Sequence, residues 1–532
     1  MTRLEVILLL VALVTHCATA FLGGQKSKKP TILHSTLTYG PADLSNDDYC
    51  VTMIIGKKDS ILVPPHLAHI IDPAIFKGMV DSLKNSFGSA TTFLSPSHRL
   101  CVCILPDKVS RNNHPMSVHT ITKLVESASG NEQGSMRVLF TGLSASTLVA
   151  PLASAVAKAF PLFSSKTSSN GQDQSSSSLH VHVSFYNEDG NVIGDDFASL
   201  SAAAAVSDGV RLAARLMDTP PEQLTTEAFA NECRQLVTDK LADSGVTMTE
   251  TVGEDLRDRG YGRLWGVGKA AIVPPRMVIL SYDPPPDGST VETVALVGKG
   301  IVYDTGGLSL KEKTGMPGMK HDMGGAAGML GGFYAAVRLG VKKRLRLVLC
   351  LAENAIGPLA VRNDDIITLY SGKTVEINNS DAEGRLVLGD GVAHATKHFD
   401  GLDLVVDLAT LTGAQMVTTG KRHAGILANK EDLEKRAVAA GLHSGDLCFP
   451  MLYAPELLKD EFKSKVADMK NSVKDRNNAQ SSCAGQFIES HLAEEYEGGW
   501  LHVDMAGPST NDERGTGYGV GLMLSLLEAP GV

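Results

Sequence analysis

The chain has 532 residues, of which 43% are apolar and 20% are charged, and its formal net charge is −10. This length exceeds one ordinary hydrophobic core, so two domains are expected, and the composition excludes a disordered or fibrous chain. The negative charge argues against a nucleic-acid partner, which would require a basic face.

The first twenty residues have the pattern of a signal or targeting peptide. Arg3 precedes an apolar run from Val6 to Val14, and Ala18-Thr19-Ala20 offers a small-x-small cleavage site. This run is too short to cross a bilayer, and no other stretch reaches the roughly 18 apolar residues that a membrane helix needs. We therefore expect a leader at residues 1–20 and no membrane span in the mature chain. A hydrophobic strand or a frayed extension is the alternative.

Residues 31–195 alternate short apolar runs with helical patterns, which indicates an N-terminal α/β domain. Runs rich in Val, Ile and Phe predict strands at Val51–Ile55, Leu100–Leu105, Val138–Thr141 and His180–Tyr186. Helical spacing predicts helices near Phe76–Ser86, Val118–Ser127 and Ser144–Phe160. The serine-rich tract 164–178 cannot bury enough apolar surface to order itself, so it predicts a disordered insertion.

Residues 196–225 predict a connecting helix, because the alanine-rich segment Ser199–Asp218 is followed by Thr219-Pro220-Pro221. Residues 226–532 form a larger C-terminal domain, with strands predicted at Met277–Tyr282, Thr293–Val297, Leu345–Ala352 and Leu404–Leu408. Continuous apolar strands separated by helices imply a mostly parallel sheet covered on both faces. The predicted fold class is α/β, with two domains that each contain a mostly parallel or mixed sheet flanked by helices.

Three segments of the larger domain are dense in acids, lysine and glycine. Residues 298–311 follow the strand expected to end at Val297, residues 319–325 open a helix, and residues 378–386 lead into another helix. In an open α/β sheet, ligands bind at the carboxyl ends of the strands. The three segments are therefore expected to meet there.

Four acids in these segments would repel one another strongly in one cleft unless cations lay between them. Two divalent metal ions about 3.5–4 Å apart would remove that repulsion, polarise a carbonyl group and generate hydroxide near neutral pH. Oxygen donors with one nitrogen suit zinc, manganese, cobalt or magnesium. The glycines between them let the backbone approach closely. A dinuclear site is therefore expected in the C-terminal domain.

Taken one at a time, these residues and patterns also have simpler structural interpretations. Ser380-x-x-Glu383 before a helix is a capping box, and Lys299 and Lys311 taken singly are expected to be solvated. Helix-surface positions, rather than metal ligation, are expected for His321, His394, His398 and His423. Cysteines in apolar runs (Cys101, Cys103 and Cys350) are expected to be buried free thiols. The order of the whole set favours the metal site.

Together the three segments closely resemble the leucine aminopeptidase family. Residues 379–386 (Asn-Ser-Asp-Ala-Glu-Gly-Arg-Leu) look like the family signature, with Ser380 where threonine is usual, so a hydroxyl is kept. The resemblance covers about residues 205–525, including 409–414 and 500–504, and is greatest to the branch called probable aminopeptidase-like 1. It is faint before residue 200.

The resemblance implies a two-metal aminopeptidase that removes N-terminal residues from peptides. The implied metal ligands are Lys299, Asp304, Asp322, Asp381 and Glu383, with Glu383 bridging the two ions. Lys311 would polarise the scissile carbonyl, and Arg385 would hold a bicarbonate ion that acts as general base. The implied substrate-binding positions are Met319, Asn379, Thr410, Leu411 and Gly413.

The resemblance also implies assembly as a homohexamer and a cytoplasmic location, whereas the leader favours the secretory pathway or an organelle. The alternative is a catalytically weak paralogue that acts as a structural or interaction protein on the same scaffold. The seven matched chemical positions are retained, which favours the enzyme.

Overall fold

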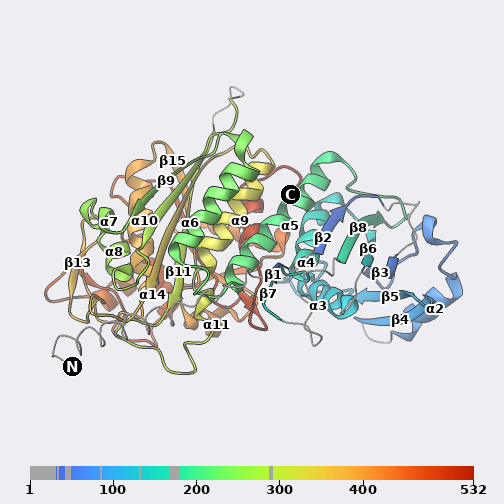
Figure 1. The fold of residues 1–532 in the computed structure, drawn as a ribbon, viewed down its shortest axis with the longest axis horizontal. Helices are drawn as coiled ribbons and strands as arrows, with labels where there is room; N and C mark the ends of the chain where they lie inside the picture. Colours follow the sequence, from blue (N-terminus) through green and yellow to red (C-terminus); the bar gives the residue numbers. More distant parts are fainter. Residues whose placement is uncertain are drawn as a thin grey trace, which may run out of the picture.

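The computed structural model describes residues 31–32, 35–41, 49–83, 87–130, 134–166, 179–286 and 291–532. Each half of the chain contains one large β-sheet, and the two lie side by side (Figure 1). The expected leader at 1–20 and most of the serine-rich tract, 167–178, lie outside the described residues. No helix in the described ranges combines the length and the apolar character needed to cross a membrane.

The N-terminal sheet contains the four predicted strands and two more, in the order β2-β8-β6-β3-β5-β4. All neighbours are parallel except the edge strand β4. The strands are β2 (Ser35–Tyr39), β3 (Tyr49–Lys57), β4 (Gly88–Ser95), β5 (His98–Leu105), β6 (Gly134–Leu143) and β8 (Leu179–Asn187). The sequence did not indicate β4, because Ser, Ala and Thr fill most of it and it carries little apolar signal.

Successive residues of a strand face opposite sides of the sheet, and helices cover both sides of this one. Met53 and Ile55 pack with α3 (Val118–Ser129) and α4 (Val149–Lys158), whereas Ile54 packs with α2 (Pro73–Ser82). The helix predicted to reach residue 86 ends at Ser82, and residues 84–86 lie outside the described ranges. A short pair, β1 (Thr31–Ile32) with β7 (Phe163–Ser164), includes the first residue of the expected insertion.

Helix α5 (Phe197–Asp218) joins the two halves, where the sequence predicted a connecting helix. Asp196 caps it by accepting a hydrogen bond from the Ser199 amide at 2.9 Å. Its small residues pack against α4 on one side and α9 (Gly324–Arg338) on the other (Figure 1). One continuous apolar core therefore extends from the N-terminal sheet through α5 into the C-terminal part.

The C-terminal sheet is mixed, with the order β17-β16-β19-β15-β11-β12-β10-β9. The central strands β19, β15, β11 and β12 are parallel, and β10, β9 and β16 run antiparallel to their inner neighbours. The strands are β9 (Thr247–Val252), β10 (Arg276–Tyr282), β11 (Thr293–Asp304), β12 (Arg344–Asn354), β15 (Leu402–Ala409), β16 (Ala424–Ala428), β17 (Cys448–Pro450) and β19 (Gly499–Asp504). The α/β class with two mixed or mostly parallel sheets is confirmed.

Strand β11 is longer than the sequence indicated. It does not end at Val297 but pairs with β12 as far as Asp304 opposite Asn354. Polar residues and glycines after Val297 suggested a loop, yet Gly298 and Gly300 lie in the strand and leave room for α9 and β12 to pack closely. A Cβ at Gly298 would lie 2.6 Å from Ala326 Cα, and one at Gly300 would lie 2.4 Å from Leu351 Cδ2.

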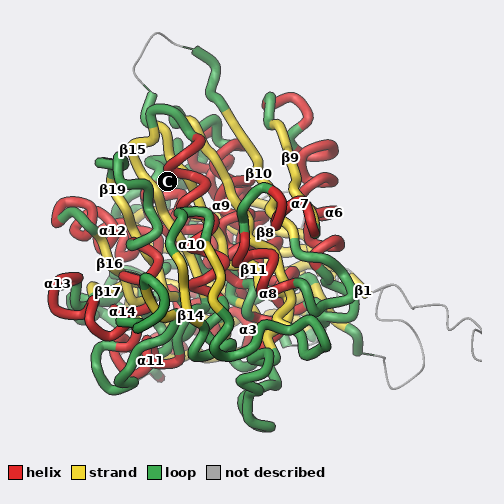
Figure 2. The backbone as a smooth tube through the Cα atoms, turned by 90° about the vertical axis from the view of Figure 1, so that its left-hand side faces the viewer, coloured by secondary structure: helices red, strands yellow, loops and turns green. Residues whose placement is uncertain are grey.

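Helices cover both faces of this sheet (Figure 2). One face carries α9, α12 (Glu431–Ser444) and α15 (Val520–Leu526), and the other carries α8 (Gly262–Gly268), α10 (Gly384–His398) and α14 (Gln480–Glu489). Helix α9 is buried on all sides, since α5 covers the face that the sheet does not.

The smaller elements surround these layers. They are α6 (Thr226–Gln235), α7 (Glu254–Asp258), α11 (Gly413–Thr419), α13 (Pro455–Leu458), the sheet β13 (Ile366–Thr368), β14 (Thr374–Glu376) and β18 (Met469–Lys470), and the hairpin β20 (Thr510–Asn511) and β21 (Arg514–Gly515). The described cysteines are free, and Cys101, Cys103 and Cys350 are buried as expected.

Candidate metal centre

The carboxyl ends of the central strands bring together the acids and lysines singled out in the sequence. Lys299 and Asp304 lie on β11, and Lys311 lies in the loop that follows. Asp322 immediately precedes α9, while Asp381 and Glu383 precede α10. Segments separated by about eighty residues therefore contribute to one cluster.

Two lysines lie between the four carboxylates. Lys299 Nζ is 2.8 Å from Asp322 Oδ1 and 3.1 Å from Glu383 Oε1. Lys311 Nζ is 2.7 Å from Asp304 Oδ2 and 2.6 Å from Asp381 Oδ1. Lys299 is only 2% exposed, so the expectation of a solvated side chain was wrong for this residue, and Lys311 is half-buried.

Burial and mutual repulsion favour the neutral forms of these acids. Burial, and then the neighbouring Asp304, raise the pKa of Glu383, and burial likewise raises the pKa of Asp322 despite the opposing charge of Lys299. Burial alone would lower the pKa of Lys299, but Asp322, Glu383 and Asp304 outweigh it and raise that pKa. The cluster is a buried concentration of negative charge that attracts cations.

The donor set fits divalent metal ions. One oxygen from each of Asp304, Asp381 and Glu383 lies within 4.8 Å of the others. Asp322 Oδ2 and Glu383 Oε2 are buried and have no hydrogen-bond partner among the described residues. Buried acceptors without a partner are costly, and a hard cation would satisfy them.

A network of hydrogen bonds fixes Asp304 and the segment before Asp381. Asp304 Oδ1 accepts bonds from the Gly306 amide at 2.9 Å and Asn354 Nδ2 at 2.8 Å, and Asn354 Nδ2 also donates to the Ser380 carbonyl at 3.1 Å. Sequence reasoning missed Asn354, although its place at the end of a buried strand was a usable signal.

Ser380 has a different role from the capping box that its spacing suggested. Its hydroxyl donates to the Gly306 carbonyl at 2.8 Å and accepts from the Ser309 amide at 2.7 Å. Helix α10 starts at Gly384 without a side-chain cap. The capping-box interpretation was therefore wrong, because the hydroxyl ties the loop after β11 to the segment that carries Asp381.

Arg385 is buried beside this cluster with part of its guanidinium unused. Its Nη1 donates to the Asn471 carbonyl at 3.1 Å, whereas Nε has no partner among the described residues. Burial lowers the pKa of Arg385 to about 10. Asn471 also donates through Nδ2 to the Asn379 carbonyl at 2.6 Å, and no sequence pattern had indicated it.

Of the expected substrate-binding residues, Thr410 and Asn379 form hydrogen bonds with residues of this cluster. The Thr410 carbonyl accepts from Lys299 Nζ at 2.9 Å, and the Thr410 hydroxyl donates to Asp322 Oδ1 at 2.9 Å. The Leu411 amide donates to Asp504 Oδ1 at 3.1 Å, and Asn379 Oδ1 accepts from the Asp381 amide at 3.0 Å. The remaining two are Met319, half-buried in the turn before Asp322, and Gly413, exposed at the start of α11.

The histidines lie apart from these hydrogen bonds and ion pairs. His398 is exposed on α10, as expected, and bonds to the Tyr370 hydroxyl at 2.6 Å. The surface expectation was wrong for His321 and His394, which are both buried, and His423 lies half-buried in a turn. His394 and His398 are four residues apart, with ring centroids 4.7 Å apart.

Family models match both halves of the chain. The catalytic domain of the cytosol aminopeptidase family matches residues 211–524, and the M17 aminopeptidase N-terminal domain 2 matches residues 53–169. Among related proteins, the probable aminopeptidase NPEPL1 of Mus musculus is 49% identical over 431 residues, covering 80% of this chain and 79% of the mouse protein. Leucine aminopeptidase 1 of Caenorhabditis elegans is 42% identical over 426 residues, covering 80% and 82%.

Solved structures agree with these matches. Leucyl aminopeptidase from Trypanosoma brucei in complex with bestatin has a TM-score of 0.83 and 38% identity, covering 93% of this chain and 96% of that one. The bottromycin maturation enzyme BotP in complex with Mn has a TM-score of 0.71 and 26% identity, covering 91% and 99%. The family and the branch expected from the sequence are confirmed. This chain belongs to the cytosol aminopeptidase family and is a metal-dependent aminopeptidase.

Proposed function

We propose that the chain removes N-terminal residues from peptides with the help of two divalent metal ions. The proposed ligands are Lys299, Asp304, Asp322, Asp381 and Glu383, and zinc, manganese, magnesium and cobalt all suit this set. The observation that carries the proposal is the convergence of four carboxylates and two amines in one cluster, where Asp322 Oδ2 and Glu383 Oε2 have no hydrogen-bond partner among the described residues.

The metal ions and the lysine side chains of the cluster would each carry out a different part of the reaction. When bound, the ions would supply Lewis acidity and lower the pKa of a coordinated water. Lys299 can serve as a ligand only as the neutral amine, so it would release its proton to solvent when a metal ion binds. Lys311 keeps its charge and would donate a hydrogen bond to the oxyanion that develops from the scissile carbonyl.

Arg385 is the proposed holder of bicarbonate, which would accept the proton of the attacking water. A planar guanidinium matches a planar anion bidentately. The support is that Arg385 is buried next to Glu383 while its Nε is without a partner in the described ranges. The substrate's first side chain is proposed to contact Met319, Asn379, Thr410, Leu411 and Gly413.

The remaining organisation is proposed as the sequence suggested it. Residues 31–195 would form an N-terminal domain, 196–225 the connection and 226–532 the catalytic domain, which two separate sheets joined by α5 support. Assembly as a homohexamer is proposed from the family resemblance alone. The competing function, a weakly active scaffold or interaction protein, is less favoured because the chemical positions that match the family are retained.

The test is the substitution Asp381→Asn, which removes one carboxylate charge from the cluster without changing its size. Hydrolysis of an aminoacyl chromogenic amide is expected to fall by about 10³-fold, because several kcal/mol of transition-state stabilisation depend on the ions. The matched control is Asp400→Asn, in an exposed turn after α10, which should leave turnover unchanged. Unaltered turnover and metal content in Asp381→Asn would refute the assignment.

A further inference from the structure

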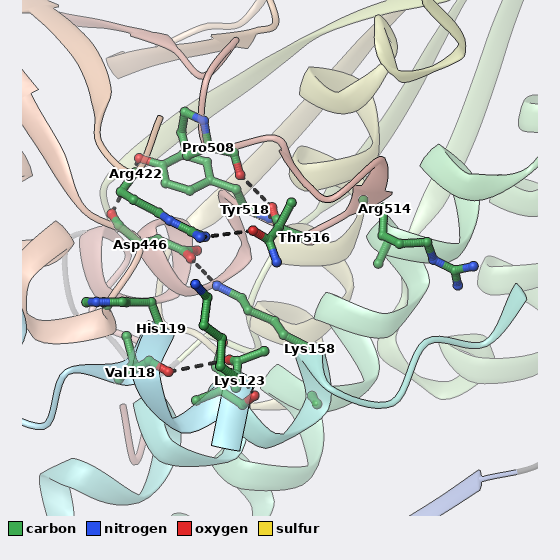
Figure 3. A pocket seen from close by; sticks show the side chains of 18 of the residues that line it. Val118, His119, Lys123, Lys158, Arg422, Asp446, Pro508, Arg514, Thr516 and Tyr518 are labelled. Atoms are coloured by element: carbon green, nitrogen blue, oxygen red, sulfur yellow. Dashed lines mark hydrogen bonds and ion pairs between the residues drawn. The ribbon is translucent and has the colours of Figure 1, made fainter. Parts of the chain in front are cut away.

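A cavity of about 190 Å³ lies where the N-terminal half meets the C-terminal half. Helices α3 and α4 form one wall, and the loops around Lys421, Asp446 and Arg514 form the other (Figure 3). None of the residues lining it belongs to the proposed metal centre. The cavity is therefore a separate site at the junction of the two halves.

Cationic side chains from both halves point toward one another in this cavity. Lys123 of α3, Lys158 at the end of α4 and Arg422 after α11 converge on its centre (Figure 3). The lining contains six cationic residues against three acids, in a protein whose net charge is −10. Convergent like charges repel one another unless an anion lies between them.

The nearby acids compensate only part of this charge. Asp446 Oδ1 is 2.8 Å from Lys158 Nζ, but Asp446 Oδ2 accepts hydrogen bonds from the Gly519 and Gly521 amides, both at 3.0 Å. Arg422 Nη2 donates to Asn511 Oδ1, a neutral acceptor, at 2.9 Å. Within the described part of the chain, neither Lys123 nor Arg422 forms an ion pair with a carboxylate.

The remaining charged or titratable groups of the lining are His119, Glu126, Arg211, Lys421, Asp512, Arg514 and Tyr518. Arg211 donates to the Phe160 and Ser35 carbonyls, and Arg514 pairs with Asp218. Burial, followed by the charges of Arg422 and Lys123, lowers the pKa of His119, which is therefore neutral at physiological pH. Glu126 and Asp512 are exposed, as are Lys123 and Arg422. Burial and then Asp512 raise the pKa of Glu126, whereas the charges of Lys123 and Arg422 oppose this shift. Even with these acids counted, the lining carries more cationic than acidic side chains.

We propose that this cavity binds a small anion bearing a phosphate group, held by Lys123, Lys158 and Arg422. Arginine presents a planar fork that matches two phosphate oxygens, and lysine adds a compact point charge. Lys158 is half-buried and Lys123 and Arg422 are exposed, so an anion from solvent could reach all three. Residues from both halves would contact the same anion, so its binding would tie the halves together.

The cavity is connected to the metal centre by a short chain of polar contacts. Arg514, in the cavity wall, has Nη2 2.9 Å from Asp218 Oδ2 at the end of α5. The Gly515 amide donates to Asp218 Oδ1 at 2.9 Å, and the Asp218 carbonyl accepts from Lys320 Nζ at 2.9 Å. Because Lys320 lies two residues before Asp322, an anion that orders this wall would also restrict the segment that carries Asp322.

The experiment is a calorimetric titration of the full chain with inorganic phosphate at low and at physiological ionic strength. The wild type is expected to bind phosphate, and the double variant Lys123→Gln/Arg422→Gln should weaken binding by about tenfold or more, since each charge-assisted hydrogen bond contributes substantially. The matched control Lys77→Gln/Lys435→Gln removes the same charge from exposed helix positions and should bind as the wild type does.

Phosphate can also bind metal ions, so Asp381→Asn is titrated in parallel. Binding in the cavity survives Asp381→Asn and is lost in the double variant, whereas binding at the metal centre shows the reverse pattern. That reverse pattern, or absence of binding by the wild type, would overturn the proposal. Phosphate should also change KM of the wild type and not of the double variant, and an unchanged KM despite binding would overturn the connection through Asp218.

Discussion

Adding a single methyl group at Gly384 should lower catalytic activity much more than it lowers the stability of the fold. It begins α10, directly after Glu383, and a Cβ built there would lie 2.5 Å from Lys299 Cε and 2.6 Å from Lys299 Nζ. Ordinary contacts between such atoms are about 3.5–4.0 Å, so the lysine must move by about 1 Å in Gly384→Ala. Lys299 is enclosed by Asp322, Glu383 and the Thr410 carbonyl, and it cannot move without leaving them.

A displacement of this size at a reacting centre costs about 10²-fold in rate. We therefore expect kcat/KM of Gly384→Ala on an aminoacyl chromogenic amide to fall by about 10²-fold, together with a loss of bound metal measured by elemental analysis. Gly384 has no positive φ, so alanine adopts its backbone conformation without strain. The thermal midpoint should fall about as much as in the control variant described next, because both substitutions overpack a buried position, which costs about 1–3 kcal/mol.

The matched control is Gly389→Ala in the same helix. Its Cβ would lie 2.6 Å from Leu369 Cδ2 and 3.1 Å from His491 Cδ2, away from the metal centre. Overpacking of this kind costs about 1–3 kcal/mol of stability and should leave kcat/KM intact. The reasoning is refuted if Gly384→Ala keeps wild-type kcat/KM and metal content, or if both variants lose activity only in proportion to their loss of folded protein.

Two further outcomes follow from charge and burial. Removal of metal by a chelator should abolish hydrolysis but leave the far-UV circular dichroism unchanged, because Lys299 and Lys311 contact the four acids directly; a large loss of helical signal would contradict this. Burial lowers the pKa of His491 from 6.5 to about 3. Between these two pH values the histidine is protonated in the unfolded chain but not in the folded protein. The free energy of unfolding therefore falls as the pH drops from about 6.5 towards 3. In His491→Gln, the slope of unfolding free energy against pH, measured by denaturant titration, should be shallower by about 1.4 kcal/mol per pH unit across pH 4–6, and an unchanged slope would disprove the assignment.

Much of the fold was predictable because its central strands are buried on both faces. Val51–Ile55 and Leu345–Ala352 are apolar except for Thr52 and Arg346, and such runs are typical of a parallel sheet covered by helices. The strands β4 and β9, at the edges of their sheets, contain only exposed and half-buried residues and gave no comparable signal. The full length of β11 could not be predicted from the sequence for a different reason. Glycines weaken a strand, so Gly298 and Gly300 suggested that it ended before them.

The site was predictable in its charged residues and not in the groups that hold them. Charged residues in the glycine-rich segments that follow strands or open helices have few structural explanations, so Asp304, Asp322 and Glu383 stood out. Asn354 and Asn471 are neutral amides, which occur in any loop, and their roles depend on contacts with residues more than twenty positions away. Only the folded chain shows that these two amides position the segment around Asp381.

The glycines near this site allow the close packing that brings its acids together. A Cβ at Gly325 would lie 2.0 Å from the Leu408 carbonyl, one at Gly298 would lie 2.6 Å from Ala326 Cα, and Gly384 faces Lys299. None of these three has a positive φ, so their role is close approach and not an unusual backbone conformation. Because the first turns of α9 and α10 rest directly on β15, β11 and Lys299, Asp322 and Glu383 reach the same lysine from opposite faces of the sheet. Side chains at the glycine positions would push the two helices away from the sheet and separate these acids. The proposed metal centre therefore depends on the spacing of the glycines as well as on the acids.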